Sequence, residues 1–309
     1  MTTNSTSVSM PRGGSHPPLG EALAAPRHTL VTRAGARLAW YGDDTGSGRP
    51  LVLFHSINAA PSSFEIKPLF DLYRGRRPVY SLDLPGFGHS DRPAGPYSAE
   101  GFAAALADFL DQVVRQPADV LALSLSGEFA ARAALQVPGR VASLVLISPT
   151  GFGERQPVSP GLGRRLHRVL TLPLLASFLY ALVSSHPSIR YFLGKSFTGK
   201  PPAALIDYAY ATSHQPGARH APLMFLSMQL FTRDAPARLY SALPADLPVL
   251  AIADRDPYVT FERLPGFVAA HPHWRYERLE PHLGLPHWER LPALAEVLDR
   301  FWAGAPTGG

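Results

Sequence analysis

The chain has 309 residues, of which 46% are hydrophobic and none is cysteine, and its net charge is +5. This composition predicts one large folded domain, or one domain with an insertion, and it excludes disulfides and cysteine-ligated metals. The basic residues form no run of like charge, so a nucleic-acid-binding patch is not indicated.

The N-terminal 25 residues, Met1 to Ala25, are rich in Ser, Thr, Gly and Pro, and we expect them to form a mobile tail. They lack an apolar segment behind basic residues, so a secretory signal is not expected. No stretch reaches the roughly 18 to 20 apolar residues that a membrane-spanning helix needs. The nearest, Val169 to Val183, is interrupted by Pro173. These features fit a cytoplasmic protein.

After this tail, the first half of the chain alternates between strand and helix patterns. A hairpin comes first, with Gly35 in the turn between its two strands. The expected strands are His28 to Ala34, Arg37 to Tyr41, Pro50 to Phe54, Val79 to Leu82, Val120 to Leu123 and Val141 to Ile147. The expected helices are Phe64 to Tyr73 and Ala99 to Val114. Short, wholly apolar strands are typical of a sheet that is covered on both faces.

The alternation stops between Phe152 and about Ala235, where the sequence predicts only helices. These are Leu162 to Ser185, Pro202 to Ser213 and Pro222 to Thr232. The alternation then resumes with strands at Pro248 to Ala253 and Trp274 to Leu279 and helices at Phe261 to Ala270 and Trp288 to Trp302. We therefore predict an α/β fold with a doubly wound, mostly parallel sheet. Its core comprises residues 26–151 and 236–304, and residues 152–235 form an inserted helical cap.

The stretch from Asp119 to Ala134 has the pattern of a strand, a sharp turn and a helix. The turn holds Ser124, with small residues, Ala122 and Ser126, two positions to either side. Small side chains are needed there because the strand and the helix approach closely at such a turn. A serine on this turn is a candidate nucleophile. We select Ser124 over Ser126, because Ser126 and Gly127 then lie where the helix begins.

A serine hydroxyl needs a base to accept its proton, usually a histidine that a carboxylate orients. Two aspartates follow the late strand that ends at Ala253, and we select Asp256 over Asp254 because it lies further into the loop. Two histidines follow the last strand. We select His287, just before the final helix, and keep His282 as the alternative. Aspartates in such loops are also typical turn caps, and histidines also have structural roles.

Acyl transfer also requires hydrogen-bond donors for the developing oxyanion. One candidate is the backbone N–H of Leu125, directly after the nucleophile. The second is the N–H of Ile57, or of Ser56, in the loop after the third strand. His55, Ser56 and Asn58 of this loop are expected to line the substrate pocket, because ligands bind beyond the carboxyl ends of the strands in such sheets.

Four stretches of the sequence resemble the capped branch of the α/β-hydrolase superfamily, over about residues 28 to 304. They are Leu53-Phe54-His55-Ser56, Asp83-Leu84-Pro85-Gly86-Phe87-Gly88-His89-Ser90, Ala122-Leu123-Ser124-Leu125-Ser126 and Leu285-Pro286-His287-Trp288-Glu289. The second stretch is the most specific and usually lies beside the pocket without a catalytic role. The resemblance implies an α/β-hydrolase fold and a catalytic triad of Ser124, Asp256 and His287.

The sequence departs from the superfamily pattern at three points. Ser56 replaces the glycine of the usual His-Gly, Ala122 and Ser126 replace the glycines of G-x-S-x-G, and Gly284-Leu285 stands where Gly-His is usual. The nucleophile is Ser rather than Asp, which disfavours dehalogenase and epoxide hydrolase chemistry.

The leading hypothesis is a carboxylesterase-like serine hydrolase that acts on an ester-like or other carbonyl substrate of largely apolar character. A C–C bond hydrolase with the same triad is an alternative, as is a non-hydrolytic ligand-binding protein on this fold. A weaker hypothesis is that Val169 to Val183 rests on a membrane surface. No metal, flavin or nucleotide cofactor is implied, because no phosphate-binding glycine loop or metal-spaced ligand cluster is present. The oligomeric state is not indicated.

Overall fold

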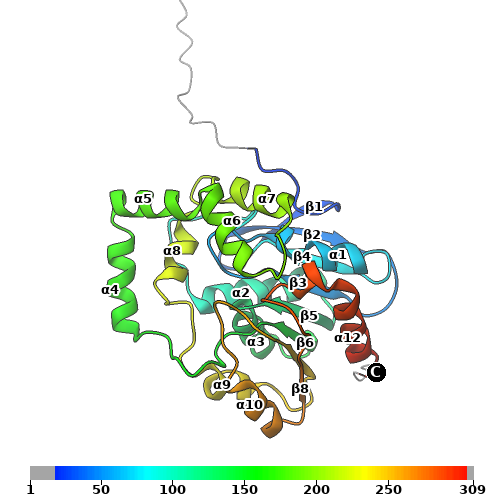
Figure 1. Cartoon of the computed structure of the whole chain (residues 1–309). Helices are drawn as coiled ribbons and strands as arrows, with labels where there is room; N and C mark the ends of the chain where they lie inside the picture. Colours follow the sequence, from blue (N-terminus) through cyan, green and yellow to red (C-terminus); the bar gives the residue numbers. More distant parts are fainter. Residues whose placement is uncertain (1–17, 305–309) are drawn as a thin grey trace, which may run out of the picture.

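The computed structural model describes residues 18–304, which form an eight-stranded sheet with helices on both faces and a group of helices at one side (Figure 1). The strand order is β1-β2-β4-β3-β5-β6-β7-β8. Strand β2 runs antiparallel to both of its neighbours, and all other neighbouring pairs are parallel. The strands are β1 (Arg27–Val31), β2 (Arg37–Asp43), β3 (Leu51–Phe54), β4 (Val79–Leu82), β5 (Ala118–Leu123), β6 (Val141–Ile147), β7 (Val249–Ile252) and β8 (Trp274–Glu277). The predicted doubly wound, mostly parallel sheet is confirmed.

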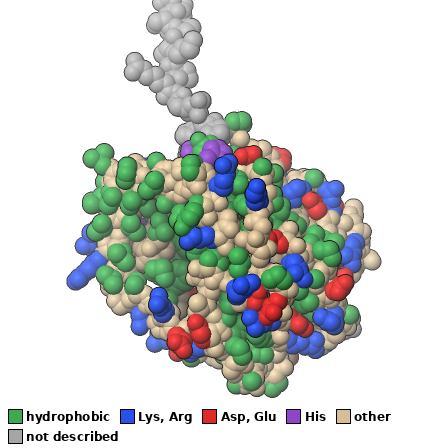
Figure 2. Space-filling view, viewed as in Figure 1, with side chains coloured by type: hydrophobic (Ala, Val, Ile, Leu, Met, Phe, Trp, Pro, Cys, Tyr) green, Lys and Arg blue, Asp and Glu red, His purple; other side chains and the backbone are tan. Residues whose placement is uncertain are grey.

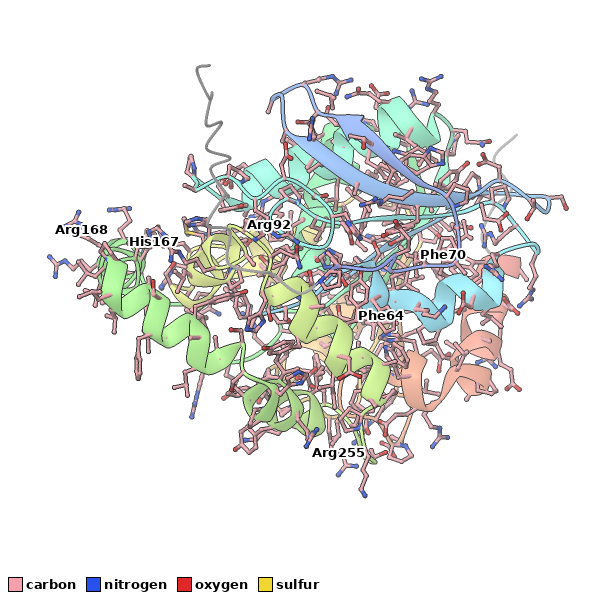
Figure 3. All side chains as sticks on the ribbon, turned by 90° about the horizontal axis from the view of Figure 1, so that it is seen from above. Phe64, Phe70, Arg92, His167, Arg168 and Arg255 are labelled. Atoms are coloured by element: carbon pink, nitrogen blue, oxygen red, sulfur yellow. The ribbon has the colours of Figure 1, made fainter. Side chains whose placement is uncertain are left out.

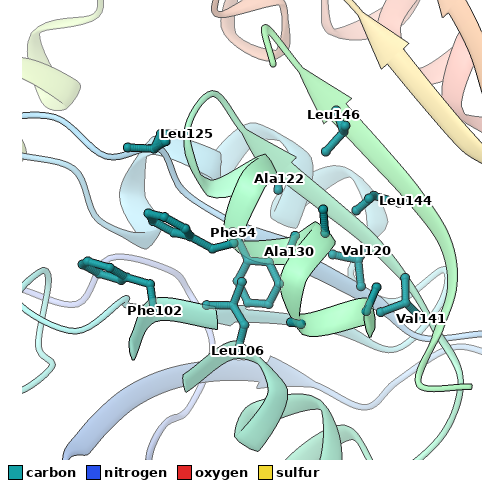
Figure 4. Packing of buried hydrophobic residues seen from close by; sticks show 14 of the residues in the cluster. Phe54, Phe102, Leu106, Val120, Ala122, Leu125, Ala130, Val141, Leu144 and Leu146 are labelled. Atoms are coloured by element: carbon teal, nitrogen blue, oxygen red, sulfur yellow. The ribbon is translucent and has the colours of Figure 1, made fainter. Parts of the chain in front are cut away.

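The side chains of the central strands alternate between two separate apolar layers. In β3, Leu51 and Leu53 pack into one layer, whereas Val52 and Phe54 pack into the other, and all four are fully buried. The helices that complete the first layer are α1 (Lys67–Tyr73) and α12 (Leu291–Ala303). Those of the second layer are α2 (Ala99–Phe109), α3 (Ser126–Gln136) and α10 (Leu264–Ala270). Figure 4 shows the second layer around Phe54. A rigid sheet covered on both faces thus presents its strand ends at fixed positions.

The chain between β6 and β7 forms the predicted helical insertion. Its main helices are α4 (Pro160–Leu170), α5 (Pro173–Val183), α6 (His186–Lys195), α7 (Ala203–Ser213) and α8 (His220–Leu226). The single helix predicted over Leu162 to Ser185 is in fact two helices, α4 and α5, bent by 90°. The bend occurs because Pro173 cannot continue a helix but is well suited to its first turn. Helix α6 was not predicted, because Pro187 interrupts the apolar pattern.

Shorter elements connect these layers. They are the 3₁₀ turns at Ser63–Ile66 and Tyr240–Ala242, the π-helical turn at Leu110–Val114, α9 (Ala235–Arg238) and α11 (Pro286–Glu289). The turn at Ser63–Ile66 precedes α1, and α11 precedes α12. The turn at Ser63–Ile66 and the residue before α11 contribute pocket-lining side chains, among them Glu65 and Leu285.

Part of the expected N-terminal tail packs against the core. Ala22 and Leu23 are only 2% and 3% exposed, and the backbone N–H of Ala22 donates to the Tyr41 hydroxyl at 3.1 Å. The prediction of a mobile tail up to Ala25 is therefore wrong for these residues, because their apolar side chains fill a gap beside β2. The rest of that prediction, for residues 1–17, lies outside the described residues.

Candidate active site

Ser124 lies on the turn between β5 and α3, and its backbone is strained. Its φ is 51°, in the left-handed region that costs a residue with a side chain about 1 to 2 kcal/mol. Two hydrogen bonds hold the turn: Ser124 N–H donates to the Ile147 carbonyl at 2.8 Å, and Gly127 N–H donates to the Ser124 carbonyl at 3.0 Å. A β-carbon at Gly127 would lie 3.0 Å from Leu146, so α3 and the sheet approach closely here. A strained serine at a strand-to-helix turn is typical of a nucleophile.

Ser126, the alternative nucleophile, does not face the pocket. It is fully buried, and its hydroxyl donates to the backbone carbonyl of His55. This bond ties the start of α3 to the loop after β3, which gives the serine at this position a structural role. Ser124, in contrast, lines the pocket between the sheet and the cap.

The loop after β3 is held by Glu65, a buried residue that the sequence did not single out. The Glu65 carboxylate accepts from Ser56 N–H at 2.7 Å, from the Ser56 hydroxyl at 2.9 Å and from the Asn58 amide at 3.4 Å. Burial raises the pKa of Glu65, and these hydrogen bonds oppose the rise. Ser56, Asn58 and Glu65 all line the pocket, as predicted for the first two. The loop is therefore fixed by a carboxylate instead of by a glycine turn.

Two backbone N–H groups, those of Ile57 and Leu125, are candidates for an oxyanion site, since Ile57 lines the same pocket as Ser124 and Leu125 follows Ser124 in the chain. The Ser56 N–H is used by Glu65, which leaves Ile57 as the donor from this loop. Within the described residues, neither Ile57 N–H nor Leu125 N–H donates to another protein group. Leu125 stands at the N-terminal end of α3, where the helix leaves its first N–H groups free. These are the two donors that the sequence predicts for an oxyanion.

His55 does not line the pocket, and that prediction is wrong. The side chain is fully buried, and its Nδ1–H donates to the Ser56 carbonyl at 2.7 Å. Its Nε2 accepts from Leu84 N–H at 3.0 Å. Burial lowers the pKa of His55, so the ring is a neutral link between the two loops that follow β3 and β4.

Asp256 lies in the loop after β7 and lines the same pocket as Ser124. Its Oδ1 accepts from the backbone N–H groups of Tyr258 at 2.8 Å and Val259 at 3.2 Å. Burial raises the pKa of Asp256 from 3.8 to about 6, against the opposing effect of these bonds and of the nearby Ser148 hydroxyl. Its carboxyl group therefore ionises close to neutral pH.

Asp254, the alternative acid, is held elsewhere. Its carboxylate accepts from Arg278 Nε at 3.0 Å and from His282 N–H at 3.2 Å. Asp254 is not among the described residues that line the pocket. It therefore fixes the loop after β8, and of the two candidate aspartates Asp256 is the one that lines the pocket.

The structure does not bring either candidate histidine to this pocket. No histidine is among the described residues that line it. His287 is fully buried, and its Nε2–H donates to the Glu65 carbonyl at 2.9 Å. His282 is also fully buried, and its Nδ1 accepts from Gly284 N–H at 3.1 Å. Burial lowers the pKa of each ring to about 4, so both are neutral. The geometry of the predicted triad is therefore not observed, because the short helix α11 turns His287 toward the 3₁₀ turn that carries Glu65.

Gly284 occupies the position beside Asp256 instead. A β-carbon at Gly284 would lie 2.5 Å from Asp256 Oδ2 and 3.8 Å from Ser148 Oγ. Gly284 has a φ of 107°, a conformation that favours glycine. The next residue, Leu285, also lines the pocket, and it stands where the superfamily's Gly-His has its histidine. Because residue 284 has no side chain, it fits beside the Oδ2 edge of the Asp256 carboxylate, near the Ser148 hydroxyl.

The pocket has a volume of about 430 Å³ and lies between the carboxyl ends of the strands and the cap. Its polar groups gather at the sheet side, where Ser124, Asp256, Glu65 and Asn58 are found. The cap side is mostly apolar and includes Val183, Ile189, Phe192, Leu193, Leu205 and Phe225, with Ser196 and Tyr208 as polar exceptions. An apolar cavity with a few converging polar groups suits a small or medium-sized, largely apolar ligand.

The sequence matches a family model described as the alpha/beta hydrolase family over residues 51–297. It is 34% identical over 138 residues to the dihydrolipoyllysine-residue acetyltransferase component of the acetoin cleaving system of Cupriavidus necator, a match that covers 44% of this chain and 35% of that protein. It is 31% identical over 115 residues to the human (lyso)-N-acylphosphatidylethanolamine lipase, a match that covers 36% of this chain and 33% of that protein. The chain thus matches only about a third of the length of these curated relatives.

Several solved structures share the fold over nearly their whole length. A serine hydrolase involved in carbazole degradation has a TM-score of 0.72 at 15% identity, covering 91% of this chain and 99% of that chain. A putative aryl esterase from Burkholderia cenocepacia has a TM-score of 0.70 at 18% identity, with the same coverage of both chains. A meta-cleavage product hydrolase from Pseudomonas fluorescens has a TM-score of 0.68 at 18% identity, covering 90% and 98%. At these identities the likeness is one of fold.

Proposed function

Because the chain belongs to the alpha/beta hydrolase family, we propose that it is a serine hydrolase acting on an ester-like carbonyl group of a largely apolar small molecule. The observation that carries this proposal is the strained turn that presents Ser124 to an apolar pocket beside two unused N–H donors. Such a turn costs stability, and strain of this kind clusters at sites where it serves a reaction.

In the proposed reaction, the Ser124 hydroxyl oxygen attacks the carbonyl carbon. The carbonyl oxygen becomes an oxyanion that accepts from the N–H groups of Ile57 and Leu125. The ester C–O bond then breaks, the alcohol leaves with a proton, and the acyl group stays on Ser124. Water attacks the acyl-enzyme in the second half and releases the acid.

We assign the acceptance of the Ser124 proton to Asp256 instead of a histidine. Among the described pocket-lining residues, the other carboxylate is Glu65, whose oxygens are occupied by the loop after β3. Asp256 offers one edge that no side chain at Gly284 covers. Its pKa of about 6 lies close to neutral pH, where a general base is most effective.

A second candidate function is ligand binding without hydrolysis. The observation that favours it is that no histidine is among the described residues that line the pocket. A carboxylate is a weaker base toward a serine hydroxyl than a histidine that is itself oriented by a carboxylate.

A C–C bond hydrolase would use the same serine and the same N–H donors as an esterase, and the two reactions differ only in the bond that breaks.

The proposal is tested by hydrolysis of a p-nitrophenyl ester series of increasing acyl length. The parent, Ser124→Ala, Asp256→Asn, His287→Ala and His282→Ala are compared. We expect activity to be lost in the first two variants and to persist in any histidine variant that still folds. A parent that is inactive on every ester, or a Ser124→Ala variant that keeps full activity, would contradict the esterase proposal.

A further inference from the structure

The outer face of α5 is a stripe of large apolar side chains that the described chain leaves uncovered. Leu174, Phe178 and Leu182 follow one another at one-turn spacing and are 88%, 67% and 58% exposed. The opposite face is anchored, since Ala176 and Tyr180 are only 3% and 9% exposed. The exposed stripe is therefore a fixed surface and not the result of a frayed helix. Figure 2 shows apolar side chains gathered over this side of the molecule.

Helix α4 extends the same surface around a corner. Leu162, Leu166 and Val169 lie on one side of this helix and are 47%, 37% and 51% exposed. Leu172, in the bend between α4 and α5, is 53% exposed. Most of the strongly exposed large apolar side chains of the described chain thus belong to one corner, which we call the α4–α5 corner. An apolar patch of this extent on one face is typical of a binding surface.

The charged residues of the chain segment that forms this corner are all basic. Arg164, Arg165 and Arg168 are exposed on α4. No Asp or Glu is present between Glu154 and Asp207, a stretch that contains the whole corner. Figure 3 shows Arg168, beside His167, at the outer end of α4, pointing away from the body of the protein. An apolar stripe bordered by arginines complements a lipid surface that carries negative headgroups.

We propose that the α4–α5 corner docks on the surface of an anionic lipid bilayer. Leu174, Phe178 and Leu182 enter the boundary between headgroups and acyl chains, while the three arginines of α4 contact the headgroups. No single described helix is long and apolar enough to cross a membrane, and α4 and α5 reach that length only as a pair bent by 90°. The proposal places the corner on the surface of the bilayer.

The apolar surface continues into the pocket. Phe192 and Leu226 are 46% and 43% exposed, and both also line the pocket. Val183, the last residue of α5, lines it too. A docked protein would thus present an apolar path from the bilayer to the cap side of the cavity. This docking does not depend on the chemistry at Ser124.

The test is co-sedimentation of the full chain with vesicles of phosphatidylcholine, or of phosphatidylcholine and phosphatidylglycerol in equal parts. We expect binding to the mixed vesicles that weakens with added salt. Leu174→Ser combined with Phe178→Ser should lower the partition coefficient by more than about tenfold, because buried apolar surface is lost. Replacing Arg164, Arg165 and Arg168 with Gln should remove the preference for phosphatidylglycerol. Val31→Ser, a substitution of a 56% exposed residue on β1, is the matched control and should bind like the parent.

A parent that stays in the supernatant with both kinds of vesicle would overturn the proposal, as would a Leu174→Ser/Phe178→Ser variant that binds like the parent. Sedimentation equilibrium tests the other occupant, a second copy of the chain. A dimeric parent that becomes monomeric in this variant, with no vesicle binding by either, would assign the corner to self-association. Hydrolysis of a short, water-soluble ester by the same variant should be unchanged, so failure of the docking proposal and failure of the proposed function are separable.

Discussion

Gly284 lies so close to Asp256 that a β-carbon at position 284 would come within 2.5 Å of Asp256 Oδ2. The carboxylate consequently has one edge held by two backbone N–H groups and the other edge facing a residue without a side chain. This relationship replaces the carboxylate–histidine pair that the sequence predicts. Under the proposed function, Asp256 is the group through which the pocket responds to pH.

Gly284→Ala should destabilise the protein by more than about 1 kcal/mol, because alanine is strained at a φ of 107° and its β-carbon would displace the carboxylate. Urea unfolding measures the change. Gly139→Ala shares the positive φ but meets nothing within 4 Å, so the difference between the two variants isolates the contact with Asp256. Equal losses in both would show that the contact with the carboxylate has no energetic consequence.

Ester hydrolysis should increase with pH around a midpoint of about 6, because Asp256 accepts a proton only when ionised and its pKa is about 6. The pH profile of kcat/KM measures this. Asp256→Asn should lose at least about 100-fold in kcat/KM, the usual scale of a general base. Asp254→Asn should keep the midpoint, since Asp254 does not line the pocket. A midpoint that survives in Asp256→Asn would assign the base to another group.

Asp256→Asn should also be more stable than the parent at pH 8 but not at pH 4. The folded state holds the proton of Asp256 more tightly than the unfolded chain, since the pKa rises from 3.8 to about 6. Protonated Asp256 therefore makes its full contribution to the free energy of unfolding below pH 3.8. This contribution, about 3 kcal/mol, is lost as the pH rises through 6. Urea unfolding of both proteins at several pH values measures the difference. A constant difference across this range would show that the pKa of Asp256 is not raised.

Ser124→Gly should stabilise the protein by about 0.5 to 1 kcal/mol while abolishing hydrolysis. Glycine relieves the strain at a φ of 51°, and this gain exceeds the added chain entropy of the unfolded state. Ser126→Gly is the control and should destabilise, because it removes a buried hydrogen bond to the His55 carbonyl. Thermal unfolding compares the two, and a loss of stability in Ser124→Gly would argue against strain at the turn.

His287→Gln should keep hydrolytic activity but lose about 1 to 3 kcal/mol of stability. The glutamine amide can still donate to the Glu65 carbonyl, but it fills the buried site of the ring poorly. Parallel measurements of kcat/KM and of urea unfolding separate the two effects. A loss of activity of several orders of magnitude at unchanged stability would restore His287 as the base.

Periodicity was sufficient to predict the sheet, because the short apolar strands differ clearly from the helices between them. Strand β4, for example, was predicted at its observed bounds, Val79–Leu82. The direction of the cap helices was not predictable, since the bend at Pro173 depends on what α5 packs against. The burial of Ala22 and Leu23 was missed for a related reason: two apolar residues in a Pro- and Gly-rich segment show no period.

The site was predicted in part. Ser124 and Asp256 were expected on different loops of one pocket, and the structure places both there. Glu65 was missed because its position between apolar neighbours looks like an ordinary helix residue until the loop folds over it. The position of His287 near the last helix was readable from sequence, but the orientation of its ring depends on the turn at Pro286.

The most direct test of the account is labelling with a serine-reactive fluorophosphonate, followed by intact-protein mass spectrometry and peptide mapping. We predict one adduct on Ser124 in the parent, formed at a rate that increases with pH around 6, and none in Ser124→Ala. A parent that forms no adduct at any pH, or an adduct that persists in Ser124→Ala, would contradict the assignment of Ser124 as the nucleophile and favour a binding protein on this fold.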